Sequence, residues 1–412
     1  MLEGSIEADI PEKSETVKVF SANSTNGGAD STLQDAHTYF RSPAPGDMAA
    51  IWPGVCLRLP PPDVPTLVVK KVYWSKKVRN PNDITLVTQL SIDRLSALEV
   101  QCSLWSGVVT AAVYVPAVDT RIVSSNKKIA NRTPSVLLDF LKEFHAAQEA
   151  SGRCKLDLLY IYEEVPSIEL VGLYPVNAMR NRALQAAKTD IVLLLDVDFL
   201  PNKNLSDEFQ SPQNYKMLHT AVSEGQAIVL PAFEITYEQE NVTDPTAAVT
   251  STVESMVSKS IESKDAVKEM LDNQQIRGFH MDGFASGHRS TDFERWLSAS
   301  VDYKVQYEEG YEPYIIARRT AVPWYDERFK GYRKNKVIHL MHMHSLGTSF
   351  IVTPRGWVVH RPHKAAPTWK VTKKTGYWKY LRKLYDRVKV EMKEGSFVPA
   401  AAFRCEFTTP SK

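Results

Sequence analysis

The sequence predicts an α/β protein with a mainly parallel central sheet that helices cover on both faces. Between residues 83 and 235, strand-like apolar segments alternate with helix-like segments, and this alternation is typical of a parallel sheet. The strand segments are continuously apolar, which indicates strands buried on both faces. With 412 residues, 43% of them hydrophobic and 24% charged, the chain is long enough to bury a sizeable core.

Residues 83–235 supply the regular part of this pattern. The segment 91–105 carries apolar residues at i, i+3 and i+4 spacing, which predicts a helix. Asp93 lies in the first turn of that helix, where a carboxylate suits the helix dipole. The predicted strands are 83–90, 108–115, 156–164, 191–196 and 226–235, and the predicted helices are 91–105, 134–150 and 177–188.

The rest of the chain lies outside this alternation. Residues 1–65 are rich in Ser, Asn, Gly, Ala and Asp and end in a Pro-rich stretch, which predicts a disordered or extended lead. Residues 236–310 are less regular, with a helix near 262–275 and a loop rich in Gly and His at 277–290. Residues 311–363 hold several short apolar segments.

Charge and cysteine usage narrow the class of protein. The net charge is +2 with Lys and Arg spread throughout, so nothing points to nucleic acid. The basic run 370–388 predicts a helix with a solvated face, with a membrane-surface patch as the alternative. No segment has the ~20 apolar residues of a membrane helix, and the N-terminus lacks the features of a signal peptide. The cysteines show no metal-binding spacing, so we expect free buried thiols and leave a disulfide open; they are Cys56, Cys102, Cys154 and Cys405.

Two aspartates end the most apolar segment of the chain. Asp196 and Asp198 follow the run 191–195, and open parallel sheets bind ligands beyond the carboxyl ends of their strands. If the backbone stays extended, both carboxylates point to the same side and repel each other unless a cation lies between them. Hard oxygen ligands suit Mg²⁺ or Mn²⁺, which would grip a diphosphate. The structural alternative is that Asp198 caps the next turn and Asp196 merely ends the strand.

The helix predicted before these aspartates carries three polar residues on one stripe. Asn177, Arg180 and Asn181 fall at i, i+3 and i+4 and therefore share a face. A cation and two amides suit a phosphate or a sugar. A solvated polar helix face is the equal alternative.

Several sequence blocks, in order, resemble one known family. "YPVNAMRNRAL" and "TDIVLLLDVDFLP" are similar to the donor-binding core of glycosyltransferase family 49, which includes the glucuronyltransferase domain of the LARGE enzymes. "ITLVTQLSIDRLSALE" and "VLPAFEI" match the family's strands on either side of that core. "DFERWLSASVDYKVQYEEGYEPYIIARR" and the block from "YDERFKGYRKNKV" to "GWVVHRPHKA" match its C-terminal part. The resemblance covers roughly residues 83–370.

The resemblance implies a GT-A fold, a divalent metal that is usually Mn²⁺ and otherwise Mg²⁺, and a UDP-sugar donor. It implies that Asp196 and Asp198 are metal ligands of a DxD motif. It also implies a third ligand, His360, after a late strand, with His363 as the alternate. An imidazole is an acceptable Mn²⁺ ligand, and the end of a strand can hold it near the aspartates.

The same resemblance gives expectations for the donor. Its uracil and ribose should lie over the end of the first strand, where four polar residues occur: Thr88, Gln89, Asp93 and Arg94. Arg180, with Asn177 and Asn181, should approach the sugar or the phosphates.

The resembled family inverts the anomeric centre, which requires a general base to accept the proton of the acceptor hydroxyl. Asn335 occupies the position where several inverting GT-A enzymes carry an acid, as it does in the family's own pattern. Glu312 and Asp326 are therefore the candidates for the base. Either carboxylate could instead be a structural partner of a nearby arginine.

The expected activity is metal-dependent, inverting transfer of glucuronic acid from a UDP-sugar to a glycan or glycoprotein acceptor. UDP-xylose, UDP-galactose and UDP-GlcNAc are alternative donors, because no residue selects among them. The donor-binding half is expected at 66–235, the acceptor-binding and C-terminal catalytic half at 236–370, and a helical tail at 371–412. The family implies the Golgi lumen, with membrane association only through a segment not visible here; a cytoplasmic or truncated protein is the alternative.

Three other classes compete with a transferase. A zinc site would use histidines of "HLMHMH", but His339 and His342 share a helix face while His344 points elsewhere, and no HExxH is present. A phosphohydrolase also uses an apolar strand ending in DxD, yet Leu200 and Pro201 follow here and no later acidic metal motif is found. A binding protein that has lost turnover is the third class.

Overall fold

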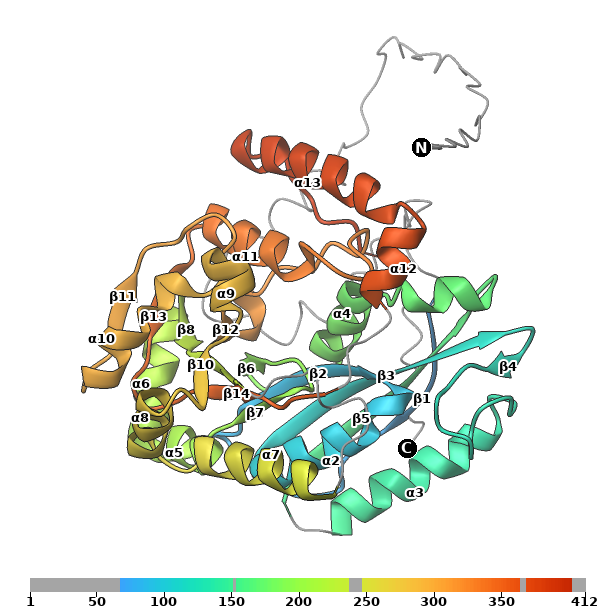
Figure 1. The fold of residues 1–412 in the computed structure, drawn as a ribbon, viewed down its shortest axis with the longest axis horizontal. Coiled ribbons are helices and arrows are strands. Elements are labelled where there is room, and N and C mark those ends of the chain that lie inside the picture. The colour runs from blue at the N-terminus through green and yellow to red at the C-terminus, as the bar shows by residue number, and fades with distance from the viewer. Residues whose placement is uncertain (1–66, 151–152, 237–246, 364–367, 402–412) are drawn as a thin grey trace, which may run out of the picture. The chain divides into compact units, whose positions relative to one another are not determined.

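The apolar segments form a ten-stranded sheet in the computed structural model, which describes residues 67–150, 153–236, 247–363 and 368–401. The strand order is β1-β5-β3-β2-β6-β12-β8-β13-β11, and β4 pairs with β3 (Figure 1). The strands are β1 (Val68–Tyr73), β2 (Thr85–Ser91), β3 (Val108–Val118), β4 (Arg121–Ile122), β5 (Lys155–Glu164), β6 (Ile191–Leu194), β8 (Gln226–Leu230), β11 (Tyr303–Val305), β12 (Tyr314–Arg318) and β13 (Ser349–Val352).

Helices connect and cover these strands. They are α2 (Leu95–Leu104), α3 (Val136–Ala150), α4 (Val176–Ala186), α5 (Leu205–Gln210), α6 (Pro212–Ser223), α7 (Ala247–Ser260), α8 (Lys264–Asp272), α9 (Met281–Phe284), α10 (Phe293–Ser298), α11 (Asn335–Ser345), α12 (Thr368–Lys374) and α13 (Tyr377–Lys393). The predicted helix 91–105 begins with a short 3-10 turn at Ile92–Arg94 before α2. The predicted helix 262–275 is the shorter α8, and the predicted loop 277–290 contains α9 and two 3-10 turns.

The parallel part of the sheet is the part that the sequence predicts. β2, β3 and β5 pair in parallel, and β6 pairs in parallel with the other edge of β2. Both faces are buried, because Val87 and Ala112 pack into one apolar cluster while Leu86 and Ala111 pack into another. Helix α4 covers the first face, and α2 and α3 cover the second (Figure 1). The predicted α/β class, with a central sheet between two helical layers, is confirmed.

The second part of the sheet is mixed and was not foreseen. β12 lies between β6 and β8 and is antiparallel to both, whereas β13 is parallel to β8. The expected donor half and acceptor half therefore contribute strands to the same sheet. All described residues belong to one compact unit, 42–412, and the functional division into two halves stays a prediction.

The predicted strand 226–235 is two strands that belong to different sheets. Pro231 separates them, because proline has no N–H to continue a ladder. Its carbonyl accepts a hydrogen bond from Val358 N at 2.9 Å. The second half joins a four-stranded sheet ordered β10-β9-β14-β7, made of β7 (Phe199–Pro201), β9 (Ala232–Ile235), β10 (Ile276–Gly278) and β14 (Val358–His360).

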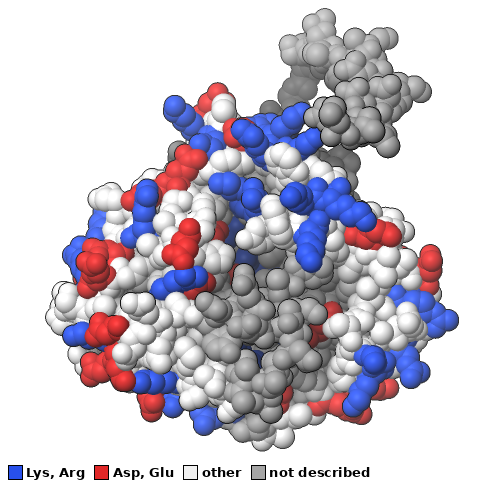
Figure 2. Space-filling model, in the orientation of Figure 1, with Lys and Arg blue, Asp and Glu red and all other residues white. Residues whose placement is uncertain are grey.

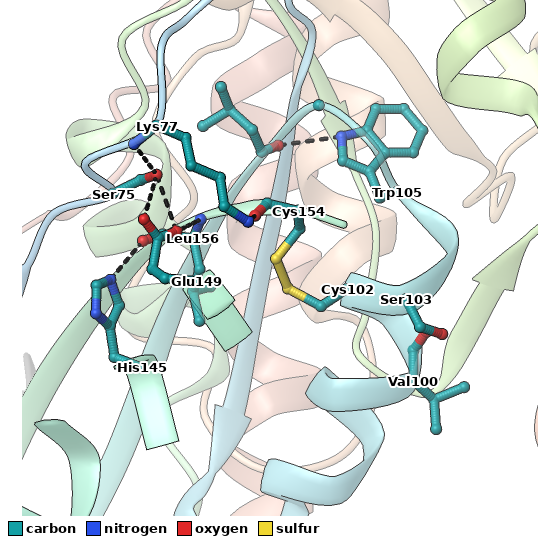
Figure 3. The surroundings of a disulfide bond; sticks show 12 residues. Ser75, Lys77, Val100, Cys102, Ser103, Trp105, His145, Glu149, Cys154 and Leu156 are labelled. Carbon is teal, nitrogen blue, oxygen red and sulfur yellow. Dashed lines mark hydrogen bonds between the residues drawn. A yellow bond between two sulfur atoms is a disulfide. The ribbon is translucent and has the colours of Figure 1, made fainter. Parts of the chain in front are cut away.

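A disulfide joins α2 to the start of β5 (Figure 3). Cys102 and Cys154 are 52 residues apart in sequence, have Cα atoms 5.1 Å apart and are both buried. The expectation of free thiols is therefore wrong for these two. Cys56 and Cys405 lie outside the described residues, as does the predicted lead 1–65.

The C-terminal helices pack on α11 through a separate apolar cluster. In α13, buried Leu381, Leu384 and Val388 recur at helical spacing and belong to the same apolar cluster as Val337 and Ile338 of α11. The opposite face is exposed, as predicted for a solvated helix. Within the described residues, no helix is long and apolar enough to cross a membrane.

The histidines of α11 lie on two faces of the helix. His339 and His342 are both buried, and His344 is exposed. His339 stacks on Tyr325 with ring centroids 3.5 Å apart. In the described part of the chain, no three His, Cys, Asp or Glu side chains are arranged as a metal-binding group.

Candidate active site

The candidate site lies where the order of the parallel strands reverses. From β2 the chain adds β3 and then β5 on one side, and it returns through α4 to place β6 on the other side of β2. The carboxyl ends of β2 and β6 therefore flank a crevice, which is the usual ligand position in such sheets. Gln89 near the end of β2 and Asp196 after β6 meet there.

Asp196 is held by three side chains from different elements. Arg180 Nη2 of α4 donates to its Oδ1 at 2.8 Å, and Gln89 Nε2 donates to the same oxygen at 3.2 Å. Tyr314 OH, at the start of β12, donates to Oδ2 at 3.1 Å. Burial raises the pKa of Asp196, but the positive charges of Arg180 and Lys336 outweigh burial and leave the pKa below its usual range. Asp196 is therefore a carboxylate at neutral pH.

The backbone turns between the two aspartates instead of staying extended. Phe199 N donates to the Asp196 carbonyl at 3.0 Å, and residues 197 and 198 form the turn. The two carboxylates consequently have separate partners. Asp198 Oδ1 accepts from Arg94, and Asp198 Oδ2 lies 3.2 Å from His363 Nε2. The like charges are thus compensated by side chains of the protein itself.

Strand β14 brings the predicted histidines to Asp198. His360 is paired in register with Phe199, and Arg361 N donates to the Asp198 carbonyl at 2.9 Å. His360 Nε2 lies 3.3 Å from His363 Nε2, so His363 stands between His360 and the carboxylate. Burial lowers the pKa of His360 to about 3, which keeps this imidazole neutral.

The residues around Asp198 fit a divalent cation by their chemistry. Carboxylate oxygens and neutral imidazole nitrogens are ligands that Mn²⁺ accepts. Asp198 lies within hydrogen-bond distance of His363, and His363 lies within hydrogen-bond distance of His360. The guanidinium groups of Arg94 and Arg180 occupy the carboxylates where a cation would bind. A cation would therefore displace at least one of these ion pairs.

The three polar residues of α4 have different roles: Arg180 lies at the site, whereas Asn177 and Asn181 bind the 325–335 segment. Arg180 also donates to Asn335 Oδ1 at 2.9 Å. Asn177 Nδ2 donates to the Asp326 carbonyl at 2.9 Å, and Asn181 Nδ2 donates to the Tyr325 carbonyl at 2.9 Å. Both asparagines are fully buried, so their contacts hold the 325–335 segment against α4.

The residues predicted to bind uracil and ribose also differ in their positions relative to the site. Gln89 bonds Asp196 and accepts from the Tyr174 hydroxyl, so it faces the site. Thr88 is buried, and its hydroxyl has no hydrogen-bond partner among the residues that the structure describes. Asp93 accepts from Ser125 N at 2.8 Å and from two serine hydroxyls, so its carboxylate holds the 124–125 loop.

The two carboxylates considered as bases have different surroundings. Asp326 is fully buried, and both its oxygens are bound by the Arg328 guanidinium, the closest contact being 2.6 Å. Glu312 is partly buried, and its main-chain N donates to the Gly287 carbonyl at 2.9 Å. Burial raises the pKa of Glu312, and the positive charge of Lys336 opposes this shift. Glu312 is thus a carboxylate next to the crevice with a raised affinity for a proton.

Several functional candidates were missed from sequence. Lys336 is buried, and its Nζ lies 3.6 Å from the centroid of the Tyr314 ring. Burial lowers the pKa of Lys336, whereas Glu312 and Asp196 oppose this shift. A small cavity of about 20 Å³ is lined by Gln89, Arg180, Asp196, Tyr314, Tyr325 and Lys336, among others. The sequence signal for these residues was the position of Tyr314, two residues after Glu312 and at the start of an apolar strand.

This chain is similar in sequence to one protein family and to several of its members. The family described as "Glycosyl-transferase for dystroglycan" matches residues 83–395. The chain is 31% identical over 295 residues to "Xylosyl- and glucuronyltransferase LARGE2s" of Gallus gallus, covering 71% of this chain and 33% of the relative. It is 30% identical over 301 residues to "Xylosyl- and glucuronyltransferase LARGE1" of Homo sapiens, covering 73% and 34%. The chain thus matches about a third of the length of these relatives.

Solved structures show weaker similarity. S. aureus TarS 1–349 in complex with UDP has 11% identity and a TM-score of 0.30, with 70% of this chain and 63% of that chain covered. GalNAc-T7 with UDP, GalNAc and Mn²⁺ has 11% identity and a TM-score of 0.33, with 71% and 47% covered. Similarity this low assigns no ligand to the present chain. The family match covers most of the chain and includes every candidate site residue, from Gln89 to His363. The chain therefore belongs to glycosyltransferase family 49.

Proposed function

We propose that this protein is a metal-dependent, inverting glycosyltransferase that transfers glucuronic acid from UDP-glucuronate to a glycan acceptor. The observation that carries the proposal is the meeting of Asp196, Asp198, His360 and His363 at the carboxyl ends of β2 and β6, in a chain of this family. UDP-xylose is the second donor, because the LARGE relatives are named xylosyl- and glucuronyltransferases. UDP-galactose and UDP-GlcNAc are less favoured.

Asp198, His360 and His363 would hold the divalent cation, and Asp196 would orient the site from the opposite side. A bound cation supplies charge neutralisation for the leaving diphosphate. Arg94 would then be available to the phosphates, because its partner Asp198 would bind the cation, while Arg180 would stay beside Asp196 at the same crevice. Gln89 lies beside Asp196, where the ribose or the diphosphate is expected.

Glu312 is the favoured general base. In the proposed reaction the acceptor hydroxyl oxygen forms a bond to the anomeric carbon, the bond from that carbon to the diphosphate breaks, and the hydroxyl proton passes to Glu312. The raised pKa of Glu312 makes the carboxylate a stronger proton acceptor than an exposed glutamate. Asp326 is less suited, because Arg328 occupies both its oxygens.

We also infer a lumenal location in the secretory pathway, with the Golgi as the expected compartment. The supporting observation is the buried disulfide between Cys102 and Cys154, because disulfides persist in oxidising compartments. The acceptor is proposed to be a glycan on a glycoprotein, which agrees with the description of the family.

The test is UDP release from a panel of UDP-sugars, with Mn²⁺ and with EDTA, for the wild type and for Asp198→Asn. We expect Mn²⁺-dependent release from UDP-glucuronate in the presence of an acceptor, and loss of about 10²-fold or more in the variant, a typical cost of losing a key charge interaction. Glu262→Gln is the matched control, because it removes a carboxylate from an exposed pair with Lys203.

Release that is equal with EDTA would remove the metal from the proposal. Release from UDP-xylose alone would change the donor and leave the site unchanged. No release from any donor, with a varied acceptor panel, would replace the transferase by a binding protein that has lost turnover.

A further inference from the structure

The C-terminal helices concentrate positive charge. Residues 368–395 contain nine Lys and Arg against three Asp and Glu, although the whole chain has a net charge of only +2. Figure 2 shows Lys and Arg side chains gathered on the part of the surface that α12 and α13 form. A local excess of this size attracts anions over about a Debye length, 8–10 Å at moderate ionic strength.

Helix α12 exposes its cations on one side and packs by the other. Lys370, Lys373 and Lys374 are exposed, and in the described part of the chain none of them forms an ion pair. Val371 and Thr372 face inward, where Val371 lies against Gly172 and Thr372 lies against Gly331. Because neither glycine has a side chain, α12 packs closely against the backbone at Gly172 and Gly331. This packing holds the helix in place with its lysines directed outward.

Two exposed aromatic rings adjoin these lysines. Tyr332 is 46% exposed and Trp369 is 38% exposed, and their ring centroids lie 5.6 Å apart at a steep angle. The guanidinium carbon of Arg333 lies 4.6 Å from the centroid of the Trp369 ring. Large aromatic rings beside cations offer both an apolar platform and positive charge at the same place.

The aromatic rings lie close to the candidate active site. Lys336 lines the cavity beside Asp196, and Asn335 accepts from Arg180 at 2.9 Å. Tyr332 precedes Lys336 by four residues, so their Cα atoms are at most roughly 14 Å apart. The segment 332–336 therefore leads directly from the crevice to the exposed rings.

We propose that Tyr332, Arg333, Trp369, Lys370, Lys373 and Lys374 form an acceptor rim, a docking surface for an oligosaccharide that carries carboxylate or phosphate groups. The sugar rings would pack on Trp369 and Tyr332, and the acidic groups would pair with the lysines and Arg333. The inference rests on the proposed transferase function. In that function the reacting end of the acceptor lies at Glu312, and the rim binds the part of the acceptor that is farther away. Charge complementarity favours an acidic chain over a neutral one, and the aromatic platform favours a sugar chain over a bare anion.

Direct binding tests this inference without relying on turnover. The full-length protein is titrated with a hyaluronan octasaccharide, which carries glucuronate, with neutral chitohexaose, and with vesicles containing phosphatidylserine. We expect octasaccharide binding that is weakened about tenfold by Trp369→Ala and by the triple variant K370Q/K373Q/K374Q. Chitohexaose and vesicles should bind more weakly than the octasaccharide.

A matched triple variant separates the rim from a diffuse field of charge. K379Q/R382Q/K383Q removes the same charge from the exposed face of α13, where no exposed aromatic pair occurs among the described residues. Equal losses in the two triple variants, with no effect of Trp369→Ala, would overturn the proposal. Vesicle binding stronger than octasaccharide binding would replace the sugar chain by a membrane surface.

The same titration in Asp198→Asn distinguishes this inference from the proposed function. We expect unchanged octasaccharide binding, because Asp198 lies at the cation site and not at the rim. Binding through Trp369 in a protein that releases UDP from no donor would retain the rim and reject the transferase. Turnover with no octasaccharide binding would retain the transferase and reject the rim.

Discussion

Glu312 and Asp326 illustrate how two acids that look alike in the sequence acquire different chemistry. Asp326 is bound at both oxygens by Arg328 within the protein, whereas Glu312 lies at the crevice near Lys336. Burial without a bidentate partner raises the pKa of the glutamate. The difference leads to opposite expectations for the two neutral variants.

Glu312→Gln should abolish transfer while leaving donor binding in place. The glutamine cannot accept the hydroxyl proton, so kcat should fall by about 10²-fold or more. In the wild type, Glu312 is protonated below its raised pKa, so kcat should increase with pH through a value above the usual ~4.3 of glutamate. Transfer rates across pH and UDP binding by calorimetry measure both effects. A glutamine variant that keeps the wild-type rate and pH profile would exclude Glu312 as the base.

Asp326→Asn should mainly reduce stability. Removing one partner of a buried ion pair leaves the Arg328 charge without compensation, which costs about 3–5 kcal/mol. Chemical denaturation measures this loss, with Glu262→Gln as the control because its pair with Lys203 is exposed and should be worth less than about 1 kcal/mol. An Asp326→Asn protein of wild-type stability but without transfer would instead make Asp326 the base.

At the scale of elements, the disulfide links α2 to Cys154, the residue just before β5. Cys102 and Cys154 close a loop of 52 residues, and in the chain-entropy account such a bond stabilises the fold by about 4 kcal/mol. The double variant Cys102→Ala/Cys154→Ala should lose about this amount in denaturation experiments. A reducing agent should destabilise the wild type but leave the double variant unchanged. Equal stability of the wild type with and without reductant would show that the bond does not form.

The sequence predicts those elements whose signals are local. β2, α2, β3, α3, β5, α4 and β6 appear where apolar runs and helical spacing indicate them. Pro231 was the visible reason for a break in 226–235, although a single strand was predicted. Insertion of β12 between β6 and β8 was not predictable, because short apolar strands do not specify distant partners.

The same distinction applies to the candidate site. The sequence indicated Asp196, Asp198 and a histidine after a late strand, because each follows an apolar strand. It did not indicate that His363 would lie between His360 and Asp198, or that Asp93 would bind the 124–125 loop. These arrangements depend on the register between β14 and β7 and on loops that the sequence pattern does not specify. The disulfide partner of Cys102 was likewise one of several possible pairings.

At the scale of the whole molecule, the proposed donor and acceptor halves share one sheet. A fragment of residues 66–235 would lack β12 and expose the facing edges of β6 and β8. We therefore expect this fragment to aggregate or to show no cooperative unfolding transition, whereas the full chain shows one. Circular dichroism during denaturation measures the difference. A cooperative, native-like transition of the fragment would establish the donor half as an independent domain.

The small sheet also has a consequence for the order of events during biosynthesis. Its strands come from residues 199–201, 232–235, 276–278 and 358–360, so the sheet cannot close before residue 360 has been synthesised. Until then neither His360 nor His363 lies beside Asp198. Before β12 is added, the edges of β6 and β8 that pair with it are also exposed. Because such non-local pairings form slowly, the nascent chain passes through an aggregation-prone interval. Asp198 and the two histidines therefore come together only after residue 363 has been synthesised, so the proposed cation site forms later than the parallel strands.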